Sequence, residues 1–363
     1  MKRVALLGLL ALLAGACGSP AAGAHGPGDG GTPDAGATDA SAGAPISATP
    51  GTWTWVDVPG SACDDGTPTG FAVNPGAGDD LLVYFEGGGA CWDYTTCFVL
   101  KSATQGPVGK AQWATRATQI NVGPFDRAHA TNAFRASSYV YIPYCTGDLH
   151  GGSNVATYTG ADTRMFHHVG HLNAVTYLAR IAATWPHPSR VVVSGTSAGG
   201  FGATLNYDMF RAAFPAAKMA LVDDAGPLLE GEGVPSGVRG PWFANWKLGD
   251  LVDPLCAGCR TDLSGLYTAL ATRHPQDRLA LLSALTDPVI SAYFMLSLDQ
   301  FQTDLRATVK DRFDPTPNAH VYVLTGTQHG LLPTTATTTS QSTLLETWLD
   351  AMVNDRAWAS VVP

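Results

Sequence analysis

Short apolar runs alternate with longer amphipathic segments over most of this 363-residue chain. The apolar runs are rich in β-branched and aromatic residues, and they predict strands at residues 81–85, 139–142, 191–194, 219–222 and 321–324. Helical periodicity predicts helices at residues 162–184, 201–214, 263–273 and 340–353. Such alternation is typical of an α/β fold with a doubly wound, mostly parallel sheet and helices on both faces. In these sheets ligands bind at the carboxyl ends of the strands, so functional residues are expected in the loops that follow the strands.

The first residues have the pattern of an export signal. Lys2 and Arg3 provide positive charge, residues 4–13 form an apolar stretch too short to span a bilayer, and small residues precede Cys17. This pattern predicts a signal peptide at residues 1–16. A cysteine in this place resembles the lipobox of bacterial lipoproteins, where it becomes the acylated N-terminus. We therefore expect a membrane-anchored lipoprotein that faces the periplasm or cell surface, or a secreted protein if Cys17 is not acylated.

The composition changes near residue 50. Gly, Ala, Pro, Asp, Thr and Ser make up almost all of residues 18–50, and such a segment buries too little apolar surface to fold. We expect residues 17–50 to be a flexible, lipid-anchored tether and residues 51–363 to form one large domain. The formal net charge is -9 and the domain has no cluster of Lys and Arg, which argues against a nucleic-acid partner.

The cysteine count suits an exported protein. If Cys17 carries lipid, six of the seven cysteines remain, and an even number is typical of a disulfide framework. The expected pairs are Cys91–Cys97, Cys256–Cys259 and, by elimination, Cys63–Cys145. The C-x-x-C pair has no further zinc ligands in its local sequence.

The stretch Gly195-Thr196-Ser197-Ala198-Gly199 carries the strongest chemical signal. It lies between the predicted strand at 191–194 and the predicted helix at 201–214, which is the context of the nucleophile elbow of α/β-hydrolases. Glycines permit the tight turn that projects the serine hydroxyl, and the N-terminus of the following helix stabilises negative charge nearby. The motif predicts Ser197 as a nucleophile on an α/β-hydrolase-like fold.

A nucleophilic serine needs a base, and in this fold the chain order is Ser, then Asp or Glu, then His. The histidines that follow Ser197 are His274, His320 and His329. His329 lies in the loop directly after the predicted strand at 321–324, where the base belongs. By contrast, His320 begins that strand, and His274 precedes a proline at a predicted helix end. The position favours His329 as the base.

The acid is chosen from a larger set. The aspartates between the nucleophile and the base include Asp223, Asp224, Asp250, Asp253, Asp287, Asp299 and Asp304. Asp223 and Asp224 directly follow the predicted strand at 219–222, a place where some related folds put the acid. Asp299 follows an apolar run and lies one element before His329, so order and spacing favour Asp299. Most of the others are expected to be helix caps or turn residues.

A glycine-rich loop, Glu86-Gly87-Gly88-Gly89-Ala90, follows the predicted strand at 81–85. It is similar to the loops of esterases whose backbone N–H groups bind the oxyanion, with the N–H of Ala198 as a further donor. A phosphate-binding loop would require a G-K-[ST] sequence, which does not follow. The cluster His167, His168 and His171 lacks the glutamate of the zinc-protease motif, so we expect no metal site.

Four sequence blocks occur in a recognisable order. They begin at Cys63, Phe85, Ile142 and Ser194 and read CDDGTP, FEGGGACW, IPYCTGD and SGTSAGG. In these blocks the chain resembles the pectin acetylesterase/Notum family of carboxylesterases, from about Cys63 to the C-terminal helix. The resemblance implies Ser197 as nucleophile, His329 as base and Asp299 as acid. It also supports the Cys91–Cys97 pair.

The resemblance further implies that Gly88 and Gly89 contribute to the oxyanion hole with Ala198. Members of the family often carry a tryptophan at the position of Gly89, which implies a more open oxyanion loop in this chain. The implied activity is hydrolysis of O-linked acyl esters, most simply acetyl esters on a polysaccharide such as pectin, without a cofactor.

Two alternatives accompany this hypothesis. A lipase or polyester depolymerase would use the same residues with a long apolar acyl pocket. A catalytically silent surface protein would bind glycan in the same cleft, where Trp92, Trp242 and Phe243 could stack on sugar rings, although core packing is the commoner use of such residues.

Overall fold

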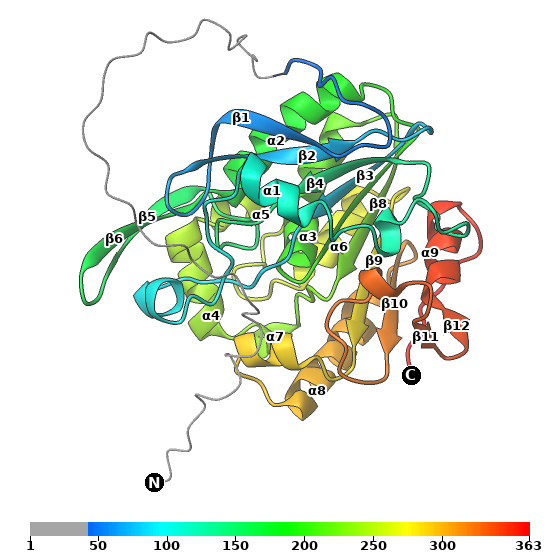
Figure 1. Ribbon diagram of the computed structural model, residues 1–363. Helices are drawn as coiled ribbons and strands as arrows, with labels where there is room; N and C mark the ends of the chain where they lie inside the picture. Colours follow the sequence, from blue (N-terminus) through cyan, green and yellow to red (C-terminus); the bar gives the residue numbers. More distant parts are fainter. Residues whose placement is uncertain (1–42) are drawn as a thin grey trace, which may run out of the picture. The chain divides into compact units, whose positions relative to one another are not determined.

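The computed structural model describes residues 43–363 (Figure 1). The predicted signal peptide at residues 1–16 and Cys17 lie outside the described residues. The end of the predicted tether does fall within them, and it packs against helix α2 (Gly170–Thr184). The side chain of Arg180 donates to the carbonyl oxygen of Ala44 at 2.6 Å, and the N–H of Ile46 donates to Thr184 Oγ1 at 2.9 Å. The folded domain therefore begins before the expected boundary at residue 51.

An eight-stranded sheet forms the centre of the domain (Figure 1), in the order β1-β2-β4-β3-β7-β8-β9-β10. The strands are β1 (Thr54–Ala62), β2 (Pro68–Asn74), β3 (Asp80–Phe85), β4 (Ser138–Ile142), β7 (Arg190–Thr196), β8 (Lys218–Asp224), β9 (Arg278–Ala284) and β10 (Ala319–Leu324). The first three positions in this order pair antiparallel, and every pair from β4 to β10 is parallel. The predicted α/β fold with a mostly parallel sheet is confirmed.

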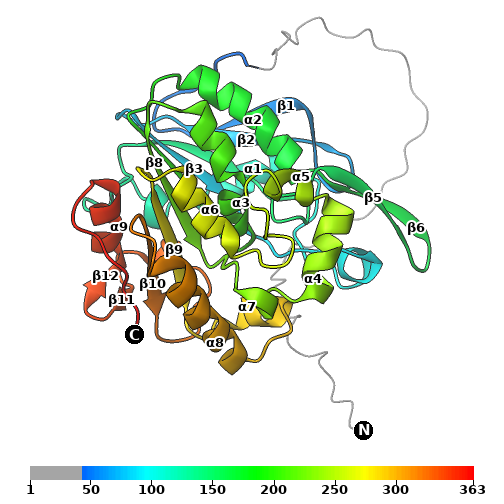
Figure 2. The ribbon, with the colours of Figure 1, turned by 180° about the vertical axis from the view of Figure 1, so that it is seen from behind.

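Helices cover both faces of the sheet (Figures 1 and 2). One apolar cluster joins the sheet to α2, α3 (Ala198–Ala213) and α6 (Gly265–Arg273), and another joins it to α1 (Lys110–Arg116) and α9 (Leu345–Val353). Alternate residues of a strand enter opposite clusters. In β3, for example, Val83 enters the first cluster and Leu82 the second. Because both faces of these strands are buried, their sequences are continuous apolar runs.

Four further helices of the described residues lie between the later strands. They are α4 (Ser236–Pro241), α5 (Gly249–Val252), α7 (Pro288–Tyr293) and α8 (Leu298–Thr308). Figure 2 shows α7 and α8 below β9 and β10 in that view.

The predicted helix at 162–184 is wrong in its first part. Residues 163–168 form strand β6 (Thr163–His168), which pairs antiparallel with β5 (Asn154–Thr159) in a hairpin. In this hairpin Ala156, Tyr158 and Phe166 are buried while the residues between them are exposed. This period-two burial identifies strands and overrides the local helical pattern. The predicted helix at 340–353 likewise starts later, because β11 (Thr339–Ser340) and β12 (Thr343–Leu344) precede α9.

The three expected disulfides are confirmed. Cys63 pairs with Cys145, Cys91 with Cys97 and Cys256 with Cys259. The first closes a loop across 82 positions and joins the end of β1 to the segment after β4. Disulfides of this kind persist in oxidising compartments, so they indicate an extracytoplasmic protein.

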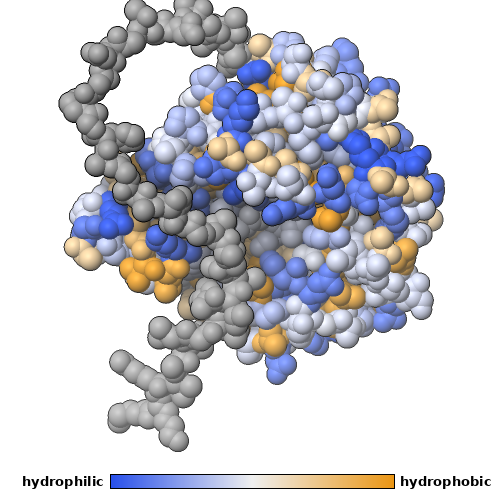
Figure 3. Space-filling model, in the orientation of Figure 1, coloured by the Kyte–Doolittle hydropathy of each residue, from blue (hydrophilic) through white to orange (hydrophobic). Residues whose placement is uncertain are grey.

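Within residues 43–363, no helix has both the length and the apolar character needed to cross a bilayer. On the face of the domain shown in Figure 3, apolar residues form small patches that polar residues separate.

Candidate active site

Ser197 occupies the sharp turn between β7 and α3. Its backbone has φ 60° and ψ -123°, a conformation that residues with a side chain rarely adopt. The two flanking glycines are required by close backbone contacts. A Cβ at Gly195 would lie 2.2 Å from the carbonyl oxygen of Gly199, and a Cβ at Gly199 would lie 1.9 Å from that of Phe85. The G-x-S-x-G spacing thus allows the turn to fit against the end of β3.

Asp224, the last residue of β8, holds this turn from both its backbone and its side chain. Its carbonyl oxygen accepts a hydrogen bond from the N–H of Ser197 at 2.7 Å, and its Oδ2 accepts one from Thr196 Oγ1 at 2.7 Å. The same carboxylate accepts hydrogen bonds from the N–H groups of Leu331 and Leu332 at 2.7 and 3.1 Å. Burial raises the pKa of Asp224, and these hydrogen bonds lower it. Asp224 therefore joins the serine turn to the loop that contains His329.

His329 lies in the loop after β10, as the sequence predicted. Its neighbour Gly330 packs directly on the serine turn, since a Cβ there would lie 2.8 Å from Thr196 Cγ2. The Nδ1 atom of His329 is 2.7 Å from Oδ2 of Asp287. In the described part of the chain no hydrogen bond joins His329 to Ser197, and such contacts are often loose until substrate binds.

Asp287 is fully buried and lies at the N-cap of α7. Its Oδ1 accepts hydrogen bonds from the N–H groups of Val289 and Ile290 at 2.8 and 3.1 Å, which leaves Oδ2 for His329. The helix N-terminus stabilises the negative charge, and the two N–H groups fix the orientation of the carboxylate. This arrangement is suited to hold an imidazole ring in one orientation and one tautomer.

Asp299, the acid favoured by the sequence, does not occupy this position. It is exposed in the first turn of α8, where the helix dipole stabilises an acidic side chain. Its carbonyl oxygen accepts a hydrogen bond from Thr303 Oγ1. The structure therefore does not bring Asp299 to His329, and the carboxylate that contacts His329 is that of Asp287. Other candidates have their own partners: Asp253 pairs with Arg260, and Asp304 accepts from Gln300.

The remaining histidines after Ser197 have structural partners. His274 caps the end of α6 and its Nε2 is 2.7 Å from Asp208. His320 packs edge-to-face against Trp358 with ring centroids 4.5 Å apart. Neither contacts the serine turn.

The glycine-rich loop after β3 lies against the serine turn. A Cβ at Gly87 would lie 2.5 Å from the carbonyl oxygen of Thr196 and 3.2 Å from Cβ of Ser197. Gly88 and Gly89 have φ values of 152° and 77°, which favour glycine. Ala198 begins α3 and is buried beside this loop. The three expected oxyanion donors thus belong to two segments that meet at Ser197.

The half-buried Glu86 and the buried His150 fix the base of this loop. The carboxylate of Glu86 accepts hydrogen bonds from Arg116 at 2.6 Å and from the N–H of Tyr144 at 2.9 Å. His150 donates from Nε2 to the carbonyl oxygen of Glu86 at 2.8 Å. Burial lowers the pKa of His150 to about 4, so its ring stays neutral at neutral pH. These contacts hold the point at which β3 ends and the loop begins.

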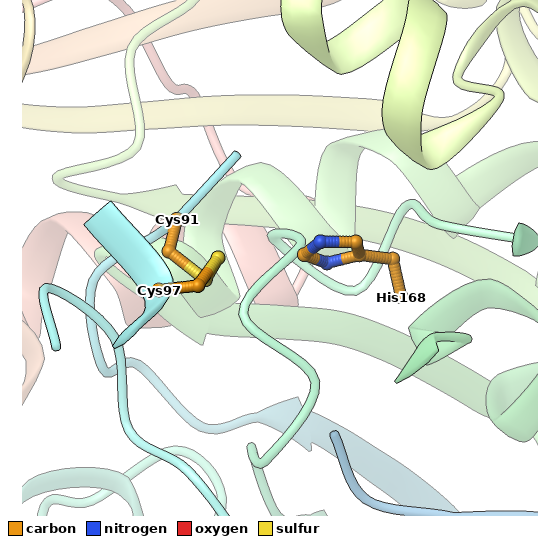
Figure 4. A group of neighbouring side chains, drawn as sticks. All are labelled: Cys91, Cys97 and His168. Carbon is orange, nitrogen blue, oxygen red and sulfur yellow. A yellow bond between two sulfur atoms is a disulfide. The ribbon is translucent and has the colours of Figure 1, made fainter. Parts of the chain in front are cut away.

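The predicted histidine cluster is divided by the fold. His167 and His168 lie on β6, and His171 lies in the first turn of α2, where its Nδ1 contacts Asn206 Oδ1 at 2.7 Å. His168 does lie beside Cys91 and Cys97, as Figure 4 shows. However, the two sulfur atoms are bonded to each other, and both ring nitrogens of His168 have partners in Tyr158 and Thr146. These three residues pack together and do not form a metal centre.

Of the three aromatic residues considered for sugar stacking, Trp242 is buried. It stacks on Trp246 with ring centroids 4.9 Å apart and contacts Trp92 edge-to-face. Phe243 is half-buried beneath the guanidinium of Arg260, 5.0 Å from the ring centroid. The cluster packs the region beside the oxyanion loop.

The sequence placed Asp287 among the candidate acids but did not favour it, because strand β9 was not predicted. A local signal was present: Asp287 precedes Pro288, and an Asp-Pro pair is typical of a helix N-cap followed by its first residue. An apolar run at residues 279–282 also precedes it.

Comparisons with known proteins identify a family for this chain. The family model described as Pectinacetylesterase matches residues 51–239. Pectin acetylesterase 11 of Arabidopsis thaliana is 26% identical over 183 residues, which cover 49% of this chain and 45% of the plant protein. Palmitoleoyl-protein carboxylesterase NOTUM of Mus musculus is 27% identical over 192 residues, which cover 51% of this chain and 34% of the mouse protein.

A third relative, the inactive palmitoleoyl-protein carboxylesterase notum1b of Danio rerio, is 29% identical over 99 residues, which cover 26% of this chain and 68% of that protein. The chain spans less than half the length of the plant and mouse relatives. The family match contains Ser197, Gly88 and Gly89, whereas Asp287 and His329 lie beyond its end.

The buried carboxyl of Asp223, next to the serine turn, makes the stability of the fold depend on pH. It accepts hydrogen bonds from Thr204 Oγ1, Tyr267 Oη and the N–H of Gly226, and burial nevertheless raises its pKa to about 8. The folded protein therefore holds this proton to a higher pH than the unfolded chain. The resulting stability is complete at low pH and is lost as the pH rises toward the folded-state pKa.

We expect Asp223→Asn to flatten this pH dependence, because a neutral amide can keep the same three hydrogen bonds once the hydroxyls reorient. Between pH 5 and pH 8, the melting temperature of the wild type should fall relative to that of the variant. The exposed Asp57→Asn, which also removes one carboxylate, serves as the control. If the melting temperatures of Asp223→Asn and wild type change with pH by the same amount across this range, the prediction is contradicted.

Proposed function

This chain belongs to the pectinacetylesterase family, and on that basis we propose that it is a serine carboxylic-ester hydrolase that removes O-linked acetyl groups from a polysaccharide. The observation that carries the proposal is the His329–Asp287 pair beside the strained Ser197 turn. A serine turn alone would also suit a binding protein. A buried carboxylate that orients a histidine next to it has a clear use in activating the hydroxyl.

In the proposed acylation step, Ser197 Oγ attacks the ester carbonyl carbon while Nε2 of His329 accepts the hydroxyl proton. Asp287 holds Nδ1–H and stabilises the imidazolium that forms. The carbonyl oxygen becomes an oxyanion that accepts hydrogen bonds from the N–H groups of Gly88, Gly89 and Ala198. When the intermediate collapses, the C–O bond to the sugar breaks and His329 returns the proton to the leaving alkoxide.

Deacylation repeats these roles with water. His329 removes a proton from water, the hydroxide attacks the acetyl-serine carbonyl, and the same N–H groups bind the second oxyanion. Collapse breaks the bond to Ser197 Oγ, which takes the proton back from His329, and releases acetic acid, which gives its own proton to solvent. Each step balances without a cofactor.

The backbone around the site favours this charge development. The N-terminus of α3 starts at Ala198, so its unpaired N–H groups face the reacting oxygen. Asp224 keeps the serine turn and the His329 loop in contact, as its hydrogen bonds to Thr196 and Leu331 require. A preorganised site of this type stabilises the transition state without reorganisation during the reaction.

The acyl group and its carrier are proposed from the family. The name of the plant relative specifies acetyl esters of pectin, and the names of the animal relatives specify a palmitoleoyl protein. A long-acyl esterase therefore remains the second candidate, and the inactive relative keeps a silent glycan-binding protein as the third. We further propose that the exported protein is held to a membrane by lipid on Cys17.

The carboxylate on His329 provides a direct test of the catalytic residues. We expect Asp287→Ala to lower kcat for p-nitrophenyl acetate by about 10³- to 10⁴-fold, because the imidazole loses its orienting partner. Asp299→Ala is the matched control and should keep kcat within about 2-fold of wild type, since Asp299 is exposed on α8. A large loss in Asp299→Ala with near-normal Asp287→Ala would overturn this assignment.

Acyl-chain preference separates the candidate functions. We expect the purified protein to hydrolyse p-nitrophenyl acetate faster than the octanoate ester, and Ser197→Ala to abolish both activities. An optimum at octanoate would favour the long-acyl esterase. Folded protein without any activity that depends on Ser197 would reject the hydrolase and favour the glycan-binding protein.

A further inference from the structure

Tyr293 ends helix α7, the helix that begins after Asp287. Its hydroxyl donates a hydrogen bond to the carbonyl oxygen of Ser102. Burial raises the pKa of the Tyr293 phenol, and a hydrogen bond with the backbone of Ala90 lowers it. The phenol thus lies between two segments, the oxyanion loop at Ala90 and the returning chain at Ser102.

These two segments meet at one isolated antiparallel bridge. Gly89 and Ala103 form an isolated β-bridge, and the N–H of Thr104 donates to the carbonyl oxygen of Gly88 at 2.7 Å. One step further along, Tyr293 Oη donates to the carbonyl oxygen of Ser102. Ser102 Oγ closes the same step by donating to the carbonyl oxygen of Ala90 at 2.7 Å.

The contact between Tyr293 and Ser102 leaves no space for a side chain at Gly89. A Cβ at Gly89 would lie 2.1 Å from Tyr293 Oη and 2.2 Å from the carbonyl oxygen of Ser102. Together with its φ of 77°, this crowding leaves room only for glycine. The sequence implied an open loop at Gly89, and the structure instead fills that side of the loop with Tyr293.

Helix α7 therefore contacts both halves of the site. Its N-cap carboxylate contacts His329, and its last side chain contacts the loop that contains Gly88 and Gly89. From this we infer that Tyr293 is a positioning residue, whose hydroxyl holds the N–H groups of the oxyanion loop in register with Ser197. The catalytic part of this inference rests on the proposed hydrolase function.

A packing role alone would give a different result. The ring of Tyr293 packs against the main apolar cluster, and Phe would preserve that packing. Removal of the hydroxyl, by contrast, takes away the hydrogen bond that Tyr293 donates to the Ser102 carbonyl beside Gly89. Small displacements of groups that stabilise a transition state reduce kcat more than KM.

The test compares Tyr293→Phe with Tyr139→Phe in the full-length protein. Tyr139 is buried, whereas Tyr293 is half-buried. The Tyr139 hydroxyl also donates to a backbone carbonyl, that of Phe134, away from the oxyanion loop. For p-nitrophenyl acetate, we expect Tyr293→Phe to lower kcat by about 10- to 100-fold with little change in KM, and Tyr139→Phe to leave both nearly unchanged. Equal kcat values for Tyr293→Phe and wild type would overturn the inference.

Amide hydrogen exchange gives a readout that does not depend on activity. We expect faster exchange in peptides that cover residues 86–104 of Tyr293→Phe, and no change there in Tyr139→Phe. If the wild type shows no esterase activity, the proposed hydrolase function fails, and exchange alone then decides whether Tyr293 holds the loop. Unchanged exchange at residues 86–104 would show that it does not.

Discussion

The serine turn is the constraint on which the site depends. Ser197 has a positive φ, and the strain is tolerated because the surrounding backbone leaves no alternative. Gly195 and Gly199 allow the chain to pass against β3, and Asp224 binds the turn through both its carbonyl and its carboxylate. Because that carboxylate also binds Leu331 and Leu332, the turn and the histidine loop are held by one buried group.

Around this centre, two short contacts bring distant parts of the chain into register. Asp287 uses one oxygen to begin α7 and the other to orient His329. Tyr293, at the far end of the same helix, meets the oxyanion loop. A single helix, α7, thus relates the base to the groups that would bind the oxyanion. This relation explains why Gly89 tolerates no side chain even though it lies in a loop.

The sequence was sufficient for features with local signals. Both glycines of the serine motif, the apolar strands beside it and the position of His329 after β10 follow from short patterns, and the structure agrees with them. The three cysteine pairs followed from spacing and elimination. These features can be predicted from the spacing of apolar residues along the sequence and from the chemistry of one or two residues.

Asp287, Asp224 and Tyr293 could not be selected in the same way. Many aspartates lie between Ser197 and His329, and only the packing of β9 beside β10 decides which one reaches the ring. Asp299 satisfied the order rule but lies on the exposed turn of α8. The hairpin at β5 and β6 was missed for a related reason, because its alternating burial depends on the Phe98 and Phe166 packing that covers it. Tertiary contacts decide each of these cases.

The most direct measurement is a crystal structure of the protein after reaction with a p-nitrophenyl phosphonate, which mimics the tetrahedral intermediate. We expect phosphorus bonded to Ser197 Oγ, with the phosphoryl oxygen accepting hydrogen bonds from the N–H groups of Gly88, Gly89 and Ala198. We also expect His329 to keep its contact with Asp287. A phosphonate on another residue, or a phosphoryl oxygen turned away from the glycine loop, would contradict this expectation.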